Sequence, residues 1–319
     1  MKIIEDDHLT ETANDEFLAE VLHGLSQSSK ALSCKWLYDE TGSRLFEAIT
    51  KTAEYYPTRV ETRLLADVVT HLRDYIPHLD VVIEPGSGSS IKTRLLLESQ
   101  PNLKQYIPID ISEDFLIETA QQLRADFTRL QINPLVADFT KPMTKLKLDS
   151  ITQRMVFFPG STIGNFSPND AKNLLKSFHT LVGSNAWLLI GVDMTQDKSK
   201  LLSAYNDAAG ITASFNLNLL SRANRELSAD FDISQFAHQA IFNQAEGRIE
   251  MHLVSKKAQN VSINGNLFNF KADEFIHTEN CYKYTLEAFT NLADDCGWQI
   301  EHIWRDEEES DYGMLLLTS

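Results

Sequence analysis

Five short runs of apolar residues constrain the fold of this chain more than any other feature. They read DVVIEPG, QYIPIDIS, NPLVADF, MVFFPGS and AWLLIGVDM, and helical patterns separate them. Each run is apolar on both faces, as expected of a strand that is covered by helices on two sides. Such strands, alternating with helices, predict a parallel sheet and an α/β fold.

Two further regions are added to this α/β pattern. Residues 14–70 have mainly helical patterns, and after Met194 the alternation stops for about ninety residues, too long for a simple crossover. This late insertion begins with two helical stretches and continues with RIEMHLVSKKAQNVSINGNLFNF, in which the alternation and the Asn264-Gly265 pair predict β-hairpins. A final helix and two strands resume the sheet. We therefore predict two interleaved domains, one of residues 60–195 and 283–319 and an α+β domain of residues 1–59 and 196–282.

The composition argues against several classes of function. The net charge of −16 repels phosphate backbones and anionic lipid, so we expect no nucleic-acid or membrane partner. No apolar run approaches the roughly 20 residues of a membrane-spanning helix, and the acidic start of the chain has no targeting pattern. Cys34, Cys281 and Cys296 match no disulfide or zinc pattern. We expect a cytoplasmic monomer with reduced thiols and no bound metal, which acts on a small molecule.

The run VVIEPGSGSSIKT places a glycine-rich turn between the first strand and the next helix. In such a turn the backbone N–H groups can approach a ligand closely, because glycine has no Cβ. A dinucleotide fingerprint would need its third glycine where this chain has Ile91, which disfavours NAD. The shorter pattern of Glu84, Gly86, Gly88 and Ser90 suits a loop around the methionine and ribose parts of S-adenosylmethionine.

Two aspartates follow the next two strands. Asp110 can accept hydrogen bonds from both ribose hydroxyls, and Asp138 can accept one from the adenine amino group. Either aspartate could instead cap a helix, but the ends of three parallel strands meet at one edge of a sheet, so the combination favours cofactor binding. Lys92, in the first turn of the helix after the loop, fits either a cofactor contact or a solvated lysine.

Several segments resemble those of one enzyme family, in the same order and with nearly unbroken spacing from about Cys34 onward. They are CKWLYDETGSRLFEAIT, EYYPTR, FFPGSTIGNF, ELSADFDI, RIEMHL and HTENCYKY. Through them the chain is similar to the L-histidine Nα-methyltransferases of ergothioneine biosynthesis, which trimethylate the α-amino group of histidine to give hercynine. The resemblance implies a Rossmann-like class I methyltransferase sheet with a woven-in α+β substrate-binding domain, and S-adenosylmethionine as cofactor.

The resemblance also implies roles for individual residues. Cofactor contacts are implied for Tyr38, Gly86, Lys92, Asp110 and Asp138, and amino-acid contacts for Phe46, Tyr55, Gly160, Asn165, Tyr205, Met251, Glu279 and Cys281. Tyr38 and Asn165 are the catalytic candidates. Asn165, Tyr55 and Tyr205 would hold the α-carboxylate and the α-amine together, and the amine could lose its proton either to water or through Tyr38. By its local sequence alone Glu279 is typical of a solvated acidic stretch, whereas the resemblance makes it the acceptor of the imidazole N–H.

Two positions differ from the family pattern. Cys281 stands where the family has a serine and is the weaker hydrogen-bonding group. Pro85 stands where an apolar residue is expected and stiffens the backbone. Two alternatives stay open, an Nα-methyltransferase for a tryptophan-type amino acid and a non-catalytic ligand-binding protein of the same fold. No nucleophile–base arrangement is visible, so we do not expect covalent catalysis.

Overall fold

A computed structural model describes residues 13–88, 91–143 and 153–319. The described residues group into two compact units. The first, here the sheet unit, comprises Pro57–Thr195 and Tyr284–Ser319, and the second unit comprises residues 13–56 and Gln196–Lys283. The assignment of cofactor binding to the first and substrate binding to the second stays a prediction.

The sheet unit contains an eight-stranded sheet in the part of the chain that the structure describes. Its strands are β1 (Val81–Pro85), β2 (Gln105–Asp110), β3 (Gln131–Ile132), β4 (Leu135–Val136), β5 (Arg154–Phe158), β6 (Trp187–Asp193), β12 (Gln299–Asp306) and β13 (Tyr312–Thr318). The order is β12-β13-β6-β5-β1-β2-β3, and β4 also pairs with β2. The strands from β6 to β3 are parallel, whereas β13 is antiparallel to both β6 and β12.

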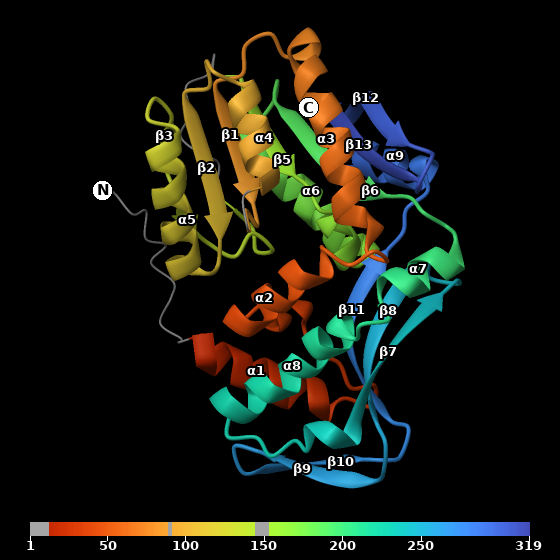
Figure 1. The fold of residues 1–319 in the computed structure, drawn as a ribbon. Coiled ribbons are helices and arrows are strands. Elements are labelled where there is room, and N and C mark those ends of the chain that lie inside the picture. The colour runs from red at the N-terminus through yellow and green to blue at the C-terminus, as the bar shows by residue number, and fades with distance from the viewer. Residues whose placement is uncertain (1–12, 89–90, 144–152) are drawn as a thin grey trace. The chain divides into compact units, whose positions relative to one another are not determined.

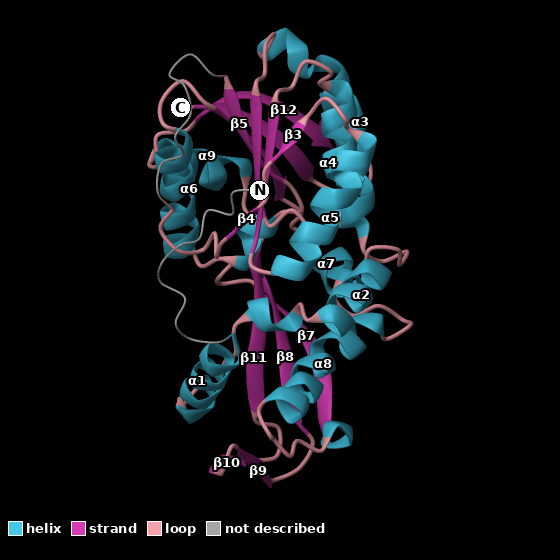
Figure 2. Cartoon of the chain, turned by 90° about the vertical axis from the view of Figure 1, so that its left-hand side faces the viewer, coloured by secondary structure: helices cyan, strands magenta, loops and turns pink. Residues whose placement is uncertain are grey.

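Helices cover both faces of this sheet, which explains why its strands are apolar on both sides. Every residue of β1 and β5 is buried, as is every residue of β6 after Trp187. The helices are α3 (Tyr56–Tyr75), α4 (Ile91–Ser99), α5 (Glu113–Asp126), α6 (Pro168–Val182) and α9 (Leu286–Asp294). Figure 2 shows α3, α4 and α5 on one face and α6 and α9 on the other. The predicted α/β fold with a parallel sheet is confirmed, although the third predicted run, NPLVADF, forms only the two-residue strand β4, and the short strand β3 lies just before that run.

The second unit combines helices with antiparallel strands (Figure 1). Its helices are α1 (Ala13–Ser26), α2 (Glu40–Ile49), α7 (Lys198–Ala204) and α8 (Ile211–Glu226), and its strands are β7 (Phe236–Asn243), β8 (Arg248–Ser255), β9 (Gln259–Ile263), β10 (Asn266–Phe270) and β11 (Phe275–Tyr282). The order β11-β8-β7 forms one sheet, and α8 packs against β7, β8 and α2. Asn264 (φ 46°) and Gly265 (φ 80°) join β9 to β10 with two positive φ angles, which confirms the predicted hairpin.

None of the helices that the structure describes combines the length and the apolar character needed to cross a membrane.

Candidate active site

The glycine loop follows β1 at the carboxyl edge of the parallel strands. Gly86 (φ 69°) has a backbone conformation that favours glycine, and a Cβ there would lie only 3.1 Å from the Phe139 ring. The Gly86 N–H donates to the Ile109 carbonyl at 2.7 Å, which ties the loop to the end of β2. Ser90, the last residue of the predicted pattern, lies outside the described residues.

Glu84, the acidic residue of the loop pattern, supports the loop from inside the protein. It is 2% exposed, and its carboxylate accepts hydrogen bonds from Tyr106 Oη at 2.6 Å and from Thr93 Oγ1 at 2.8 and 3.0 Å. Burial raises the pKa of Glu84 to about 8, against the effect of these hydrogen bonds. The carboxylate thus connects β1 to β2 and α4.

Asp110 and Asp138 follow β2 and β4, and both accept hydrogen bonds from the turn that they begin. Asp110 Oδ1 accepts the Ser112 N–H at 3.0 Å, and Asp138 Oδ1 accepts the Thr140 N–H at 3.0 Å and its hydroxyl at 2.5 Å. Burial raises the pKa of Asp110, whereas hydrogen bonds from the backbone of Ser112 and Gly88 lower it. The contact with Gly88 brings Asp110 to the glycine loop. Since an ionised carboxylate has about four acceptor positions, Asp110 keeps the capacity to bind ribose hydroxyls, and the residues of this edge fit S-adenosylmethionine.

Lys92 and Gly160 meet at a single carboxylate of the sheet unit. The Lys92 ammonium forms an ion pair with Glu61, whose side chain is 0% exposed, so Lys92 is not a freely solvated lysine. The Gly160 N–H donates to both Glu61 oxygens at 2.7 and 2.9 Å. Asn165, the other predicted substrate residue of this unit, ends a 3₁₀ helix, Thr162–Asn165.

In the second unit, the predicted aromatic residues form one continuous cluster. The Tyr38 and Phe46 rings lie 5.5 Å apart, Phe46 and Tyr55 6.2 Å apart, and Tyr55 and Tyr205 6.2 Å apart, all in edge-on contact. Phe215 of α8 completes the cluster, with its ring 5.3 Å from that of Tyr38 and 6.0 Å from that of Phe46. These residues come from α2, α8 and the loops beside them.

The remaining predicted substrate residues lie on β8 and β11, and one of them, Cys281, contacts a buried lysine. Met251 on β8 is paired with Glu279 on β11. Cys281 Sγ accepts a hydrogen bond from Tyr205 Oη at 2.8 Å, and Lys283 Nζ lies 3.2 Å from both of these atoms. Tyr205 therefore links the aromatic cluster to the face of β11.

Glu279 is a buried carboxylate, so its interpretation as a solvated surface charge is wrong. Its relative exposure is 9%, and burial raises its pKa to about 7 while the Lys283 charge lowers it. Burial, followed by the Glu279 charge, raises the pKa of Tyr38 well above its usual value. Tyr38 is consequently a neutral phenol at pH 7. A proton relay through Tyr38 therefore has to use its neutral hydroxyl group, which both donates and accepts hydrogen bonds.

Sequence reasoning missed Glu61 and Lys283, although each left a signal. Glu61 lies on the apolar stripe of α3 that continues through the fully buried Leu65, Val68 and Leu72, a position where a glutamate needs a partner. Lys283 continues, at period two, the face of β11 that carries the predicted glutamate and cysteine. For Phe215 no such signal existed, because an aromatic residue on the buried face of a helix is ordinary.

One group of side chains in the described part of the chain has the composition of a metal site. Ligand atoms of Glu250, His252 and His277 lie within 4.8 Å of one another. However, Glu250 already accepts hydrogen bonds from Arg248 at 2.8 Å, Asn243 at 2.9 Å and His252 at 3.0 Å. The carboxylate charge is thus paired with Arg248, and the group is complete without a cation.

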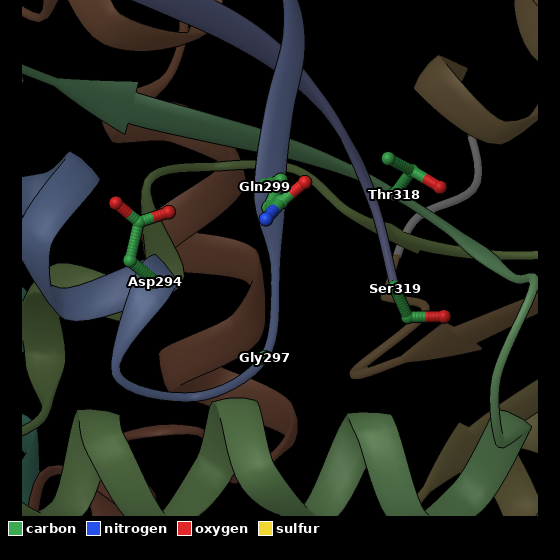
Figure 3. Close-up of a pocket in the computed structure, with 5 residues that line it drawn as sticks. All are labelled: Asp294, Gly297, Gln299, Thr318 and Ser319. Atoms are coloured by element: carbon green, nitrogen blue, oxygen red, sulfur yellow. The ribbon is translucent and has the colours of Figure 1, made fainter.

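A pocket of the sheet unit lies away from the glycine loop. It is lined by Asp294, Gly297, Gln299, Thr318 and Ser319, as Figure 3 shows. Thr318 is paired with Trp187, the first residue of β6, which places the pocket at the amino edge of the parallel strands. Ligands of open parallel sheets bind at the carboxyl edge, so the glycine loop marks the candidate site and this pocket does not.

The strand order, with one antiparallel strand between β6 and β12, and the glycine loop with its aspartates define a class I S-adenosylmethionine-dependent methyltransferase. The model of a family of histidine-specific, S-adenosylmethionine-dependent methyltransferases matches residues 17–319, and the chain belongs to this family.

Comparison with individual proteins agrees with this assignment. The chain is 36% identical to the histidine N-alpha-methyltransferase of Mycobacterium tuberculosis (strain CDC 1551 / Oshkosh), over 99% of each chain. It is 35% identical to the protein of the same name from Mycolicibacterium smegmatis, over 96% of each. It is also 31% identical to ergothioneine biosynthesis protein 1 of Neurospora crassa, over 88% of this chain and 32% of that protein.

Proposed function

We propose that this enzyme methylates the α-amino group of L-histidine three times, with S-adenosylmethionine as the methyl donor, in ergothioneine biosynthesis. When bound, the cofactor supplies an electrophilic methyl group on a sulfonium. The enzyme has to hold a neutral amine in line with that methyl group, so positioning accounts for most of the catalysis. Its role as an S-adenosylmethionine-dependent methyltransferase follows from the family.

One observation carries the choice of histidine, namely the buried carboxylate of Glu279 opposite Met251. A carboxylate buried at this depth needs a donor, and an imidazole N–H is one. The Met251 thioether can pack flexibly against the ring face. An indole has a larger apolar surface and one N–H, so a site for tryptophan would more naturally have an apolar residue at position 279.

The proposed amine-side groups are neutral, which suits repeated methylation. Tyr55, Tyr205 and Asn165 offer hydroxyl and amide groups, and the raised pKa values of Tyr38 and Tyr205 keep both phenols protonated. Hydrogen bonds that the amine N–H groups donate to these oxygens can be given up one by one as the N–H groups are replaced by methyl groups. A fixed salt bridge to the amine would resist the second and third transfers.

A substrate panel tests the proposal. Purified protein is incubated with S-adenosylmethionine and each amino acid separately, and S-adenosylhomocysteine formation is followed, with histidine and tryptophan also in direct competition. We expect histidine to be preferred and mass spectrometry to find the trimethylated product. A preference for tryptophan would contradict the choice of substrate. If none of the amino acids is methylated, the protein is a binding protein and not an enzyme. A product that stays monomethylated would contradict the proposal of three successive transfers.

A further inference from the structure

Glu61 is the meeting point of four segments of the sheet unit. It belongs to α3, and its carboxylate contacts Lys92 at the start of α4, Gly160 after β5 and Tyr312 at the start of β13. Tyr312 Oη donates to Glu61 Oε1 at 2.8 Å, and the Gly160 N–H donates to both oxygens. Each contacting group is a donor, and an ionised carboxylate is purely an acceptor, so the residue type matches its surroundings.

The sheet leaves room for this carboxylate at one position of β6. A Cβ on Gly191 would lie 1.9 Å from Glu61 Oε1 and 2.7 Å from Tyr312 Oη. Any larger residue at position 191 would therefore displace Glu61. A fully buried carboxylate is costly unless it is paired and hydrogen-bonded, and Glu61 satisfies both conditions through Lys92, Gly160 and Tyr312.

The groups that Glu61 holds belong to the two sets of residues proposed for the reaction. Lys92 is a proposed cofactor residue, and Gly160 is a proposed substrate residue. Gly160 (φ 88°) and Ser161 (φ 52°) form a turn with two consecutive positive φ angles, directly before the 3₁₀ helix that ends at Asn165. Because a serine in this conformation is unfavourable, the turn needs support, and Glu61 supplies it through the Gly160 N–H.

We propose that Glu61 is a positioning residue for methyl transfer, which holds the Lys92 ammonium and the Gly160–Ser161 turn in one fixed arrangement. The inference rests on the proposed function for its kinetic part. It also changes the role of Gly160: the N–H of this residue is used by Glu61, so any contact of Gly160 with the amino acid uses other atoms.

Glu61→Gln tests the proposal, because it keeps the shape of the side chain but removes the charge. The Lys92 ammonium then loses its ion-pair partner, and the amide NH₂ must face one of the donors. We expect the Kd for S-adenosylhomocysteine, measured by calorimetry, to rise about tenfold, and kcat for histidine to fall about 10- to 100-fold, as for a small displacement of reacting groups. Glu98→Gln, an exposed change on α4, is the matched control and should alter neither value.

The measurements separate positioning from a purely structural role. Both values are expressed per folded molecule, with the folded fraction taken from the stoichiometry of S-adenosylhomocysteine binding, well below the Tm of each variant. A lower Tm with unchanged Kd and kcat would overturn the proposal. In a double-mutant cycle, Lys92→Met should add little to the loss caused by Glu61→Gln, and additive losses would contradict the coupling.

A second variant and a measurement independent of histidine turnover complete the test. If Glu61→Gln does not fold, Tyr312→Phe removes one hydrogen bond to Glu61 and keeps the ring, and kcat per folded molecule should fall about threefold or more, because one of the hydrogen bonds that hold Glu61 in place is lost. An unchanged kcat in this variant would overturn the inference. If wild type does not turn over histidine, the proposed function fails, but the Kd for S-adenosylhomocysteine still decides the role of Glu61.

Discussion

At the scale of the residue, Glu279 has the strongest expected effect on substrate choice. Its replacement by alanine removes a charge-assisted hydrogen bond to the imidazole, which typically contributes about 1.5–3 kcal/mol. We expect kcat/KM for histidine to fall roughly 10- to 150-fold, with a relative gain for larger aromatic amino acids. Glu246→Ala, an exposed change in the same unit, is the control. A Glu279→Ala variant that keeps its activity on histidine would show that another group recognises the imidazole.

The same residue predicts a pH dependence of stability. The pKa of Glu279 is about 7 in the folded protein, against an ordinary value of 4.5. Since the folded pKa is raised, the stability that Glu279 contributes is complete below the unfolded pKa and is lost as the pH rises through about 7, by up to roughly 3 kcal/mol. Glu279→Gln does not titrate, so its free energy of unfolding relative to wild type should be higher at pH 8 than at pH 5. Urea denaturation at both pH values measures this, and an equal difference at both would contradict it.

At the scale of the element, α2 depends on the residue that caps it. Asp39 Oδ1 accepts the Gly42 N–H at 2.7 Å and the Asn218 amide at 2.7 Å, and Oδ2 pairs with Arg225 at 2.6 Å. The cap thus begins the helix and also attaches it to α8. Because α2 carries Phe46, and Tyr38 directly precedes the cap, the cap also orients two proposed site residues.

We expect Asp39→Ala to lower the free energy of unfolding by about 2 kcal/mol at pH 7, the upper range for a cap. Asp197→Ala removes a cap whose described partners are the backbone N–H groups of Ser199 and Lys200, and it should cost about 1 kcal/mol. Burial raises the pKa of Asp39, but the hydrogen bonds from Gly42, Arg225 and Asn218 outweigh it and lower the pKa below 3.8. The contribution of Asp39 is therefore present above that pH and lost as the pH falls below it. Urea denaturation of both variants gives the comparison, and equal costs would contradict the attachment to α8.

At the scale of the whole molecule, the proposed binding residues are divided between the two units. Gly86, Lys92, Asp110 and Asp138 belong to the sheet unit, whereas Tyr38 and most of the proposed histidine contacts belong to the second unit. A ligand that binds only the folded state stabilises the part that it contacts.

Hydrogen exchange should report this division. S-adenosylhomocysteine alone is expected to slow exchange most in the glycine loop and at the ends of β1 and β2. Histidine, added with S-adenosylhomocysteine, is expected to extend the protection to β8, β11 and α8. Mass spectrometry of peptic peptides measures both effects. If S-adenosylhomocysteine protected β8 and β11 more than the glycine loop, the assignment of the cofactor to the sheet unit would be wrong.

The sequence by itself determined the features that local pattern encodes. Apolar runs on both faces predicted the parallel sheet, the glycine run predicted the loop after β1, and Asn264-Gly265 predicted the hairpin that the φ angles confirm. The ordered motifs also determined the family, which the match over residues 17–319 confirms. These features depend on neighbours within a few residues or on the order of short motifs. A single amino-acid sequence is therefore enough to predict them.

The tertiary structure alone decided which charged residues are buried and what they contact. Glu84 accepts hydrogen bonds from Tyr106 and Thr93, and Glu279 is buried near Lys283. Glu61 contacts Lys92, Gly160 and Tyr312, and Tyr312 lies 251 positions away in the sequence. The pKa and the hydrogen-bond partners of a charged group depend on the dielectric and the donors around it. Those surroundings come from segments that are distant in the chain, and packing, rather than local pattern, brings them together.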